Sequence, residues 1–125
     1  MRTPILVTLL LSSGILLALT HTAALMFNLH YTYPWLDIPL HLLGGVVVAL
    51  LLCVAGIFPR LRLKLTFLRI EICVLVIGLL WEAFELTIGV SYDEPGFIVD
   101  TVVDLSMDLV GGAIGYFIAH RLSTI

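Results

Sequence analysis

The chain of 125 residues is 61% hydrophobic and only 12% charged, and its formal net charge is −3. Soluble globular domains are closer to half apolar and about one quarter charged, so this composition excludes an ordinary soluble domain and indicates an integral membrane protein. We therefore expect the lipid bilayer as a partner. Because basic residues are few, we expect no nucleic acid as a partner.

Four apolar stretches each come close to the roughly twenty residues that a helix needs to cross the hydrocarbon core. We predict spans at about residues 4–27, 38–58, 70–90 and 98–119. No linker, repeat or low-complexity run separates them, so residues 1–125 are expected to form a single transmembrane domain. The expected fold class is an all-α membrane protein, a four-helix transmembrane bundle.

The first stretch has an alternative interpretation as a cleaved signal peptide, because Arg2 precedes its leucine-rich run and Ala23 and Ala24 lie near its end. If the span is retained, His21 lies roughly 9 Å below its outer end by helical rise. That depth makes His21 a candidate for a polar cluster, although a lone histidine more often caps a neighbouring polar group.

The basic residues predict the orientation of the spans. Every Lys and Arg lies near the N-terminus, within residues 60–69 or near the C-terminus, which places them all on one side of the four predicted spans. Because segments rich in Lys and Arg face the cytoplasm, we expect both termini to be cytoplasmic, in a multi-pass protein of the inner (plasma) membrane. The connections 28–37 and 91–99 lack basic residues and carry Tyr and Trp, which is typical of an outer aromatic belt.

Polar residues in the second span face one direction. Asp37 is expected at the outer mouth, and His41 lies one helical turn, about 6 Å, deeper on the same face. Gly44 and Gly45 continue this face, so it can accept a neighbouring helix closely below the histidine.

The third and fourth spans each carry acids on one face in their outer halves. In the third, Glu82 and Glu85 share a face and lie roughly 12 Å and 7 Å below the outer end. In the fourth, a face of three aspartates continues inward as glycines: Asp100, Asp104, Asp108, Gly111, Gly112 and Gly115. The acids of the two spans and the histidine of the second are therefore expected at similar depth.

Carboxylates gathered in a medium of low dielectric cannot all be ionised unless something neutralises them, because burial and like-charge repulsion both favour the protonated form. No Lys or Arg falls in the outer half of any predicted span. A bound metal cation, bound protons and water in an open cavity are the remaining explanations. We favour the metal, because an imidazole and several carboxylates suit Mg²⁺, Mn²⁺, Fe²⁺ or Zn²⁺.

The predicted ligands of a divalent metal are His41, Glu82, Glu85, Asp104 and Asp108. Asp37 and Asp100 are expected at the rim or in an outer shell, with Asp37 orienting His41. Water activated by such an ion attacks a phosphate or an ester, so metal-dependent hydrolysis or transfer on a lipid or envelope precursor is one hypothesis. Glu82 and Asp104 are then the candidate catalytic carboxylates.

Two other functions fit the same residues. The acidic face of the fourth span, together with Glu71 near the other surface, suggests a component of a cation or proton transporter or channel. The faces of small residues suggest a structural or assembly subunit, which includes self-association into a homo-oligomer. The residues alone do not decide between these functions and an enzyme.

Three runs carry a family resemblance: Asp37-Ile-Pro-Leu-His41-Leu-Leu-Gly-Gly, Trp81-Glu-Ala-Phe-Glu85, and Asp100-Thr-Val-Val-Asp104-Leu-Ser-Met-Asp108-Leu-Val-Gly-Gly. They resemble the uncharacterised YjdF-type inner-membrane family and, more distantly, the VanZ-like family linked to glycopeptide resistance. The resemblance implies a small polytopic membrane protein with a DxxxH, WExxE and DxxxD signature. It implies no particular reaction.

Overall fold

In the computed structural model of the protein, the described residues are 3–57, 65–89 and 96–123. Arg2 and the segments 60–64 and 91–95, which bear on the predicted orientation, lie outside them. All elements of the described part of the chain are helices: α1 (Thr3–Met26), α2 (Leu29–Thr32), the short 3-10 helix η1 (Pro34–Leu36), α3 (Asp37–Ile57), α4 (Phe67–Ile88) and α5 (Phe97–Ser123).

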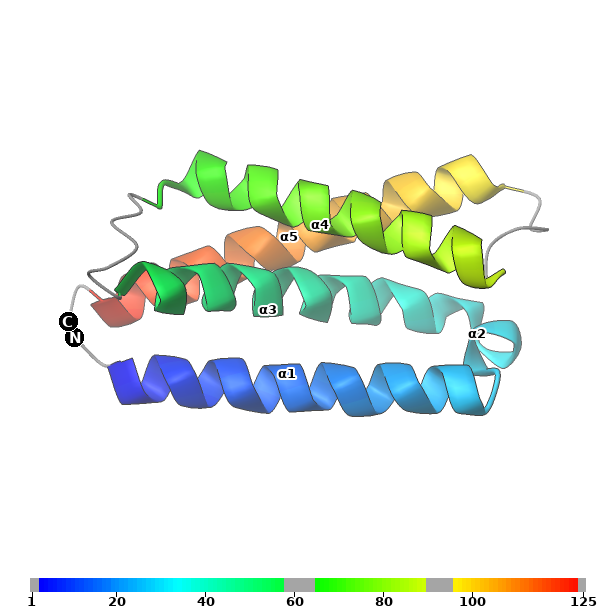
Figure 1. Cartoon of the computed structure of the whole chain (residues 1–125), viewed down its shortest axis with the longest axis horizontal. Helices are drawn as coiled ribbons and strands as arrows, with labels where there is room; N and C mark the ends of the chain where they lie inside the picture. The colour runs from blue at the N-terminus through cyan, green and yellow to red at the C-terminus, as the bar shows by residue number, and fades with distance from the viewer. Residues whose placement is uncertain (1–2, 58–64, 90–95, 124–125) are drawn as a thin grey trace.

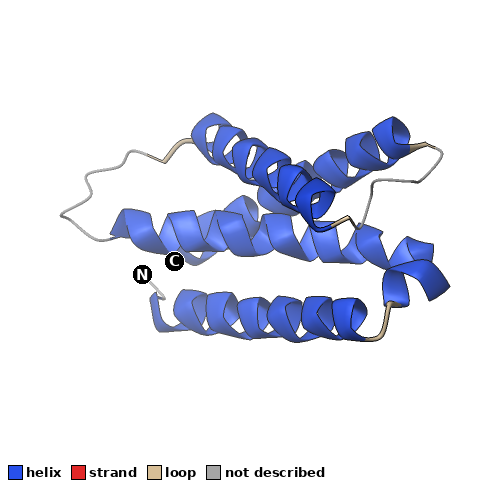
Figure 2. Cartoon of the chain, turned by 45° about the vertical axis from the view of Figure 1, so that its right-hand side comes forward, coloured by secondary structure: helices blue, strands red, loops and turns tan. Residues whose placement is uncertain are grey.

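The long helices α1, α3, α4 and α5 run lengthwise through the molecule, and the first residues of α1 and the last of α5 lie at the same end (Figure 1). α3 makes its most extensive contact with α5, and α4 packs mainly on α5. Figure 2 shows α1 on the side of α3 that faces away from α4 and α5. The three helices α3, α4 and α5 therefore enclose one interior, and α1 packs against the other side of α3.

Three helices in the described residues are long and apolar enough to cross a membrane: Thr3–Met26, Pro34–Ile57 and Phe97–Ser123. They correspond to the predicted spans at 4–27, 38–58 and 98–119. α4 has 22 residues and is thus roughly 33 Å long, but it carries four charged side chains, so composition alone does not identify it as a span. That α4 crosses the membrane stays a prediction.

Large apolar side chains cover the outside of the molecule. Leu11, Ile15 and Leu19 on α1, Leu80 on α4 and Ile98 on α5 are all exposed. Soluble monomers rarely expose apolar surface on this scale, whereas a bilayer offers these side chains hydrocarbon in place of water. The exposed surface thus agrees with a membrane protein.

Glycines allow α3 and α5 to approach until their backbones touch. A Cβ atom at Gly45 would overlap the carbonyl oxygen of Asp108, and one at Gly111 would overlap that of Leu42. A Cβ atom at Gly115 would lie 2.8 Å from the Cβ of Ala49. The predicted glycine faces of the second and fourth spans are therefore the contact surface between the two helices.

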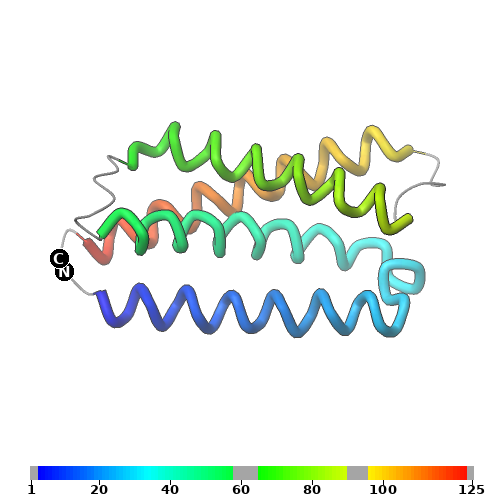
Figure 3. The backbone as a smooth tube through the Cα atoms, viewed as in Figure 1, coloured from blue at the N-terminus to red at the C-terminus, as the bar shows by residue number. Residues whose placement is uncertain are grey.

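The connection between α1 and α3 is itself helical. Asn28 adopts the left-handed conformation (φ 52°), which asparagine tolerates better than most residues, and the chain then turns directly into α2. Figure 3 shows α2 as a tight coil between the ends of α1 and α3. This turn brings His30 next to the first residue of α3.

The apolar core lies in the half of the molecule away from the acids. Two groups of buried side chains form it: Leu6, Leu50 and Ala119 in one, and Ala49, Ile70 and Val74 in the other. The other half of the interior, between the outer parts of α3, α4 and α5, is filled by ionisable side chains instead.

Candidate functional site

The five side chains predicted as metal ligands are all buried in the structure. The exposed fractions are 5% for His41, 6% for Glu82, 4% for Glu85, 2% for Asp104 and 6% for Asp108. They come from three helices, with the imidazole on α3, two carboxylates on α4 and two on α5. Ionisable groups are costly to bury in a membrane, by roughly 2.5–3.5 kcal/mol each on insertion scales, so this gathering calls for a function.

The imidazole of His41 lies at the centre of the cluster. Its Nε2 atom is 3.7 Å from Glu82 Oε1, 3.8 Å from Asp37 Oδ1 and 3.9 Å from Asp104 Oδ2. One carboxylate from each of the three helices therefore faces the same ring nitrogen.

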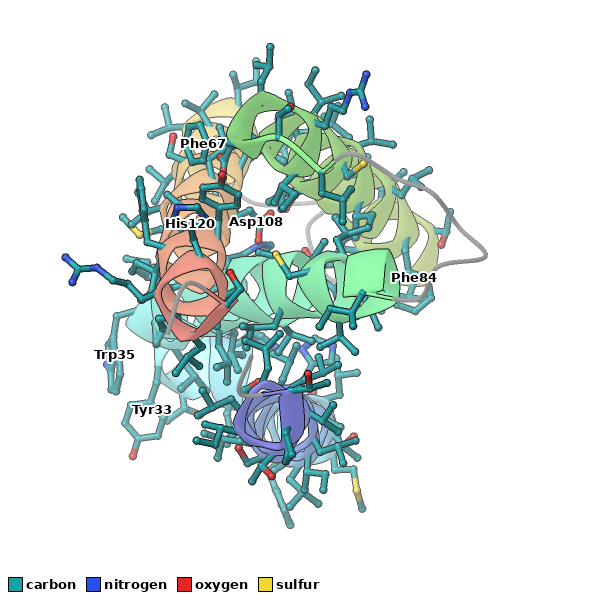
Figure 4. All side chains as sticks on the ribbon, turned by 90° about the vertical axis from the view of Figure 1, so that its left-hand side faces the viewer. Tyr33, Trp35, Phe67, Phe84, Asp108 and His120 are labelled. Carbon is teal, nitrogen blue, oxygen red and sulfur yellow. The ribbon has the colours of Figure 1, made fainter. Side chains whose placement is uncertain are left out.

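The other ring nitrogen of His41 is held by Asp108, whose Oδ1 lies 3.2 Å from Nδ1. An ionised carboxylate can only accept a hydrogen bond, so Nδ1 is the donor when Asp108 is ionised. In a neutral ring, Nε2 then presents its lone pair to the three other carboxylates. Figure 4 shows Asp108 pointing into the space that α3, α4 and α5 enclose.

Two glycines make room for the carboxylate of Asp108. A Cβ atom at Gly78 of α4 would lie 2.5 Å from Asp108 Oδ2, and one at Gly44 of α3 would lie 3.7 Å from Oδ1. A larger residue at the first position would push the carboxylate away from His41. Gly78, which lies on the same face of α4 as the two glutamates, is thus part of the site.

Hydrogen bonds fix the two glutamates of α4. Thr101 Oγ1 donates to Glu82 Oε2 at 3.0 Å, and Trp81 Nε1 donates to Glu85 Oε1 at 3.0 Å. Thr101 and Trp81 were not among the predicted site residues. The i, i+4 spacing of Trp81 and Glu85 was a signal for the second contact, whereas the first joins two helices and has no local signal.

Several carboxylate oxygens in the cluster are buried and have no hydrogen-bond partner. They include Glu82 Oε1 and Asp37 Oδ1, which are the atoms nearest to Nε2 of His41, and Asp108 Oδ2. Leaving a buried polar atom unsatisfied costs about 1–3 kcal/mol, and more for a charged group. Folding would not be expected to leave these atoms together without a cation, protons or water between them.

Three sets of ligand atoms lie close enough to share an ion, since the atoms within each set are within 4.8 Å of one another: Asp37, His41 and Glu85; His41, Glu82 and Asp104; and Asp37, Asp100 and Asp104. Asp37 and Asp100, expected at the rim, appear in these sets. Asp108, expected as a ligand, appears in none of them and bonds the far side of the imidazole. The geometry thus favours a different division of roles from the one that periodicity suggested.

Two further histidines lie at the outer rim. His30 Nδ1 is 3.7 Å from Asp37 Oδ1, and the His30 ring lies 6.0 Å from that of His21. The His21 ring also packs edge-on against Trp81, at 4.8 Å between centroids. His21 therefore borders the cluster without joining any of the three sets. His30 was missed, because it belongs to a connection for which no helix was predicted.

A cavity of about 310 Å³ adjoins the cluster. Asp37, His41 and Asp108 lie at one end of it, and its remaining walls come from α1, α3 and α4 and are almost entirely apolar. The ionisable cluster is thus reached from a hydrophobic groove.

Membrane-type helices around a buried cluster of carboxylates and one imidazole define an all-helical membrane protein with a candidate metal centre. The chain belongs to the family described as predicted membrane protein (DUF2238), whose model matches residues 3–124. This match is consistent with the resemblance to the YjdF-type family, and the more distant VanZ-like resemblance stays a prediction. Comparisons with curated proteins and with solved structures found no match.

Proposed function

We propose that this protein binds one divalent metal ion between α3, α4 and α5, near the outer surface of the inner (plasma) membrane. In this proposal α4 is the fourth span of a four-helix transmembrane bundle whose termini are both cytoplasmic. Its packing against α5, a helix fit to span, supports this, as does the burial of both glutamates of its outer half in the interior.

The observation that carries the proposal is the pairing of His41 Nε2 with unpartnered carboxylate oxygens. Nε2 lies 3.7 Å from Glu82 Oε1 and 3.8 Å from Asp37 Oδ1, and neither oxygen has a hydrogen-bond partner. With Nε2 unprotonated this arrangement is repulsive, and a metal cation or a proton between the atoms makes it favourable.

The distances favour a metal ion over a proton on Nε2. A hydrogen bond from a protonated imidazole would bring the oxygen to about 2.7–3.2 Å, closer than any of the three carboxylates comes to Nε2. Bonds from Mg²⁺, Mn²⁺, Fe²⁺ or Zn²⁺ to nitrogen or oxygen are about 2.0–2.2 Å long, so one ion can bridge atoms that are roughly 4 Å apart.

The ligands we assign are Nε2 of His41 and the carboxylates of Glu82 and Asp104, with Asp37 and Glu85 completing the shell. Asp108 bonds Nδ1, the ring nitrogen that does not face the ion, as a carboxylate does for many metal-bound histidines. Oxygen predominates in this set, which suits Mg²⁺, Mn²⁺ and Fe²⁺ better than softer ions.

The chemistry that such an ion would supply is activation of water for metal-dependent hydrolysis or transfer on a lipid or envelope precursor. Glu82 or Asp104, whichever had an oxygen free of the ion, would be the base that accepts a proton from the water. The apolar groove that reaches His41 supports a lipid-linked substrate.

Metal analysis of detergent-purified protein tests the proposal. Wild-type protein that has been loaded and desalted should retain close to one ion per chain, whereas the His41→Ala and Glu82→Gln variants should not. Glu71→Gln, which neutralises another carboxylate of α4 away from the three ligand sets, is the matched control and should retain the ion. Absence of stoichiometric metal in wild-type protein, or equal retention in all variants, would show the proposal to be wrong.

A second candidate function, a cation or proton pathway, is favoured by the position of Glu71. A Cβ atom at Gly112 would lie 2.8 Å from Glu71 Oε1, so this carboxylate reaches α5 one turn, about 6 Å, below Asp108. Glu71 Oε1 is also buried without a hydrogen-bond partner. The acids of α5 are thus continued inward by an acid of α4. Cation and proton flux into proteoliposomes distinguishes the functions, because only a pathway requires Glu71.

A further inference from the structure

The groove beside the cluster runs inward along α3. Its lining on α3 begins at Asp37 and ends at Val48, which spans roughly 16 Å by helical rise. α1 and α4 form its two sides, for instance through Leu17 and Ile77. In the end view of Figure 4, α1 and α4 lie apart from each other on different sides of α3.

The walls of this groove are hydrocarbon for most of its length. Gly14 of α1 lines it, and a Cβ atom there would meet nothing within 4 Å. Apolar cavities of this kind stay dry. In a bilayer, a groove between helices is open to lipid chains, and an empty one would forfeit the dispersion contacts of its lining.

The polar part of the groove has an unpartnered acceptor. Asp108 lines it, is 6% exposed and keeps Oδ2 without a hydrogen-bond partner. Asp37 also lines this part, but we have assigned its carboxylate to the ion. Within the described residues no Lys or Arg lines the groove, and the basic group next to Asp108 is the imidazole of His41, which bonds its other oxygen. The remaining oxygen of Asp108 complements a head group that carries positive charge and donates hydrogen bonds.

We propose that the groove holds one hydrocarbon chain of a membrane phospholipid whose head group ends in an ammonium, with the ammonium beside Asp108. The chain then extends inward past Gly14 and Val48, in the direction expected for a lipid of the outer leaflet. The inference rests on the proposed function, because it names an aminophospholipid as the substrate class of the same site, but the groove itself does not depend on the metal.

Photolabelling in vesicles tests this inference. The protein is reconstituted into equal parts of phosphatidylethanolamine and phosphatidylglycerol, with a trace of either lipid carrying a diazirine in its acyl chain. Labelled residues are identified by mass spectrometry of peptides. Leu17 of α1 and Val48 of α3 line the groove and are half-buried, so a hydrocarbon chain in the groove contacts both of them.

The ethanolamine probe should label Leu17 and Val48 about tenfold more than the glycerol probe does. Gly14→Leu fills the groove and should abolish most of this labelling, and Ala18→Leu, also in its wall, should act likewise if the first variant does not fold. Thr22→Leu adds an apolar side chain at an exposed site of α1 outside the groove and should leave labelling unchanged.

Absence of labelling at both Leu17 and Val48, or undiminished labelling in a folded groove-filling variant, would overturn the inference. Equal labelling by the two probes would overturn the choice of an ammonium head group. Glu82→Gln removes a proposed ligand that does not line the groove, so it should lose the metal and keep the labelling. Labelling without metal in wild-type protein refutes the metal proposal alone, and metal without labelling refutes the lipid inference alone.

Discussion

Replacing Asp108 tests whether this residue orients His41 or binds the ion itself. Asp108→Asn keeps the shape of the side chain and can still accept the hydrogen bond from Nδ1, which spans 3.2 Å in the structure, but it removes the negative charge. A hydrogen bond to a charged group contributes about 1.5–3 kcal/mol, roughly twice a neutral one, so about 1.4 kcal/mol of support should be lost. That loss corresponds to about a tenfold weaker metal affinity.

The measurement is a competition titration with a chelator on detergent-purified protein. Loss of a partner behind a metal-bound histidine typically weakens binding 10- to 100-fold, so Asp108→Ala should fall near the upper end of that range and still bind one ion. Asp104→Asn removes a direct ligand and should weaken binding more than Asp108→Asn does. Asp100→Asn, at an exposed position, should weaken it least.

Two results would refute this assignment of Asp108. An affinity within about threefold of wild type in Asp108→Asn would mean that the contact with Nδ1 does not support the ligand. Complete loss of stoichiometric metal, as expected for His41→Ala, would mean that Asp108 binds the ion directly, which is the role that the sequence suggested.

Other outcomes follow from the same contacts. Gly45→Ala should destabilise the protein by about 1–3 kcal/mol, measured by thermal unfolding in detergent, because its methyl group would overlap backbone of α5. Gly14→Ala, with open space around its Cβ position, should be neutral or slightly stabilising, and equal losses in the two variants would contradict the packing argument. In a Trp35→Phe background, metal should change the fluorescence of Trp81, whose indole donates to Glu85, and a silent titration would count against Glu85 lying near the ion. Metal at about 100 times its dissociation constant should raise stability by about 2.7 kcal/mol, and a chelator should reverse this; no shift would mean that the folded state does not bind it preferentially.

Helical periodicity was sufficient to predict that His41 lies close to acids of all three helices. The spacing of Asp37 and His41, and that of Glu82 and Glu85, placed each pair on one face, and counting residues from the span ends placed the faces at one depth. The structure brings these four side chains together with Asp104.

Periodicity could not predict which atoms meet, because rotamers and helix tilt decide that. It gave no means to tell that Asp108 would lie behind the imidazole and Asp37 in front of it. It also gave no means to place His30, whose position depends on the left-handed turn at Asn28. These features are set by contacts between segments distant in the sequence.

The span boundaries were set by signals other than hydropathy. α4 begins at Phe67, three residues before the predicted start, because the side chain of Thr66 caps it by accepting from the backbone N–H of Arg69. α5 continues to Ser123, beyond the predicted end at 119. Apolar content thus predicts the approximate position of these helices, and the cap at Thr66 sets where α4 begins.

The backbone contact between α3 and α5 divides the proposed site into two unlike halves. His41 and Asp104 stand on helices that glycines hold together, whereas Glu82 and Glu85 stand on α4, which contacts α3 far less. An ion bound by both halves would link α4 to the other two helices. Its removal should therefore first increase amide hydrogen exchange along α4, while the α3–α5 pair stays protected.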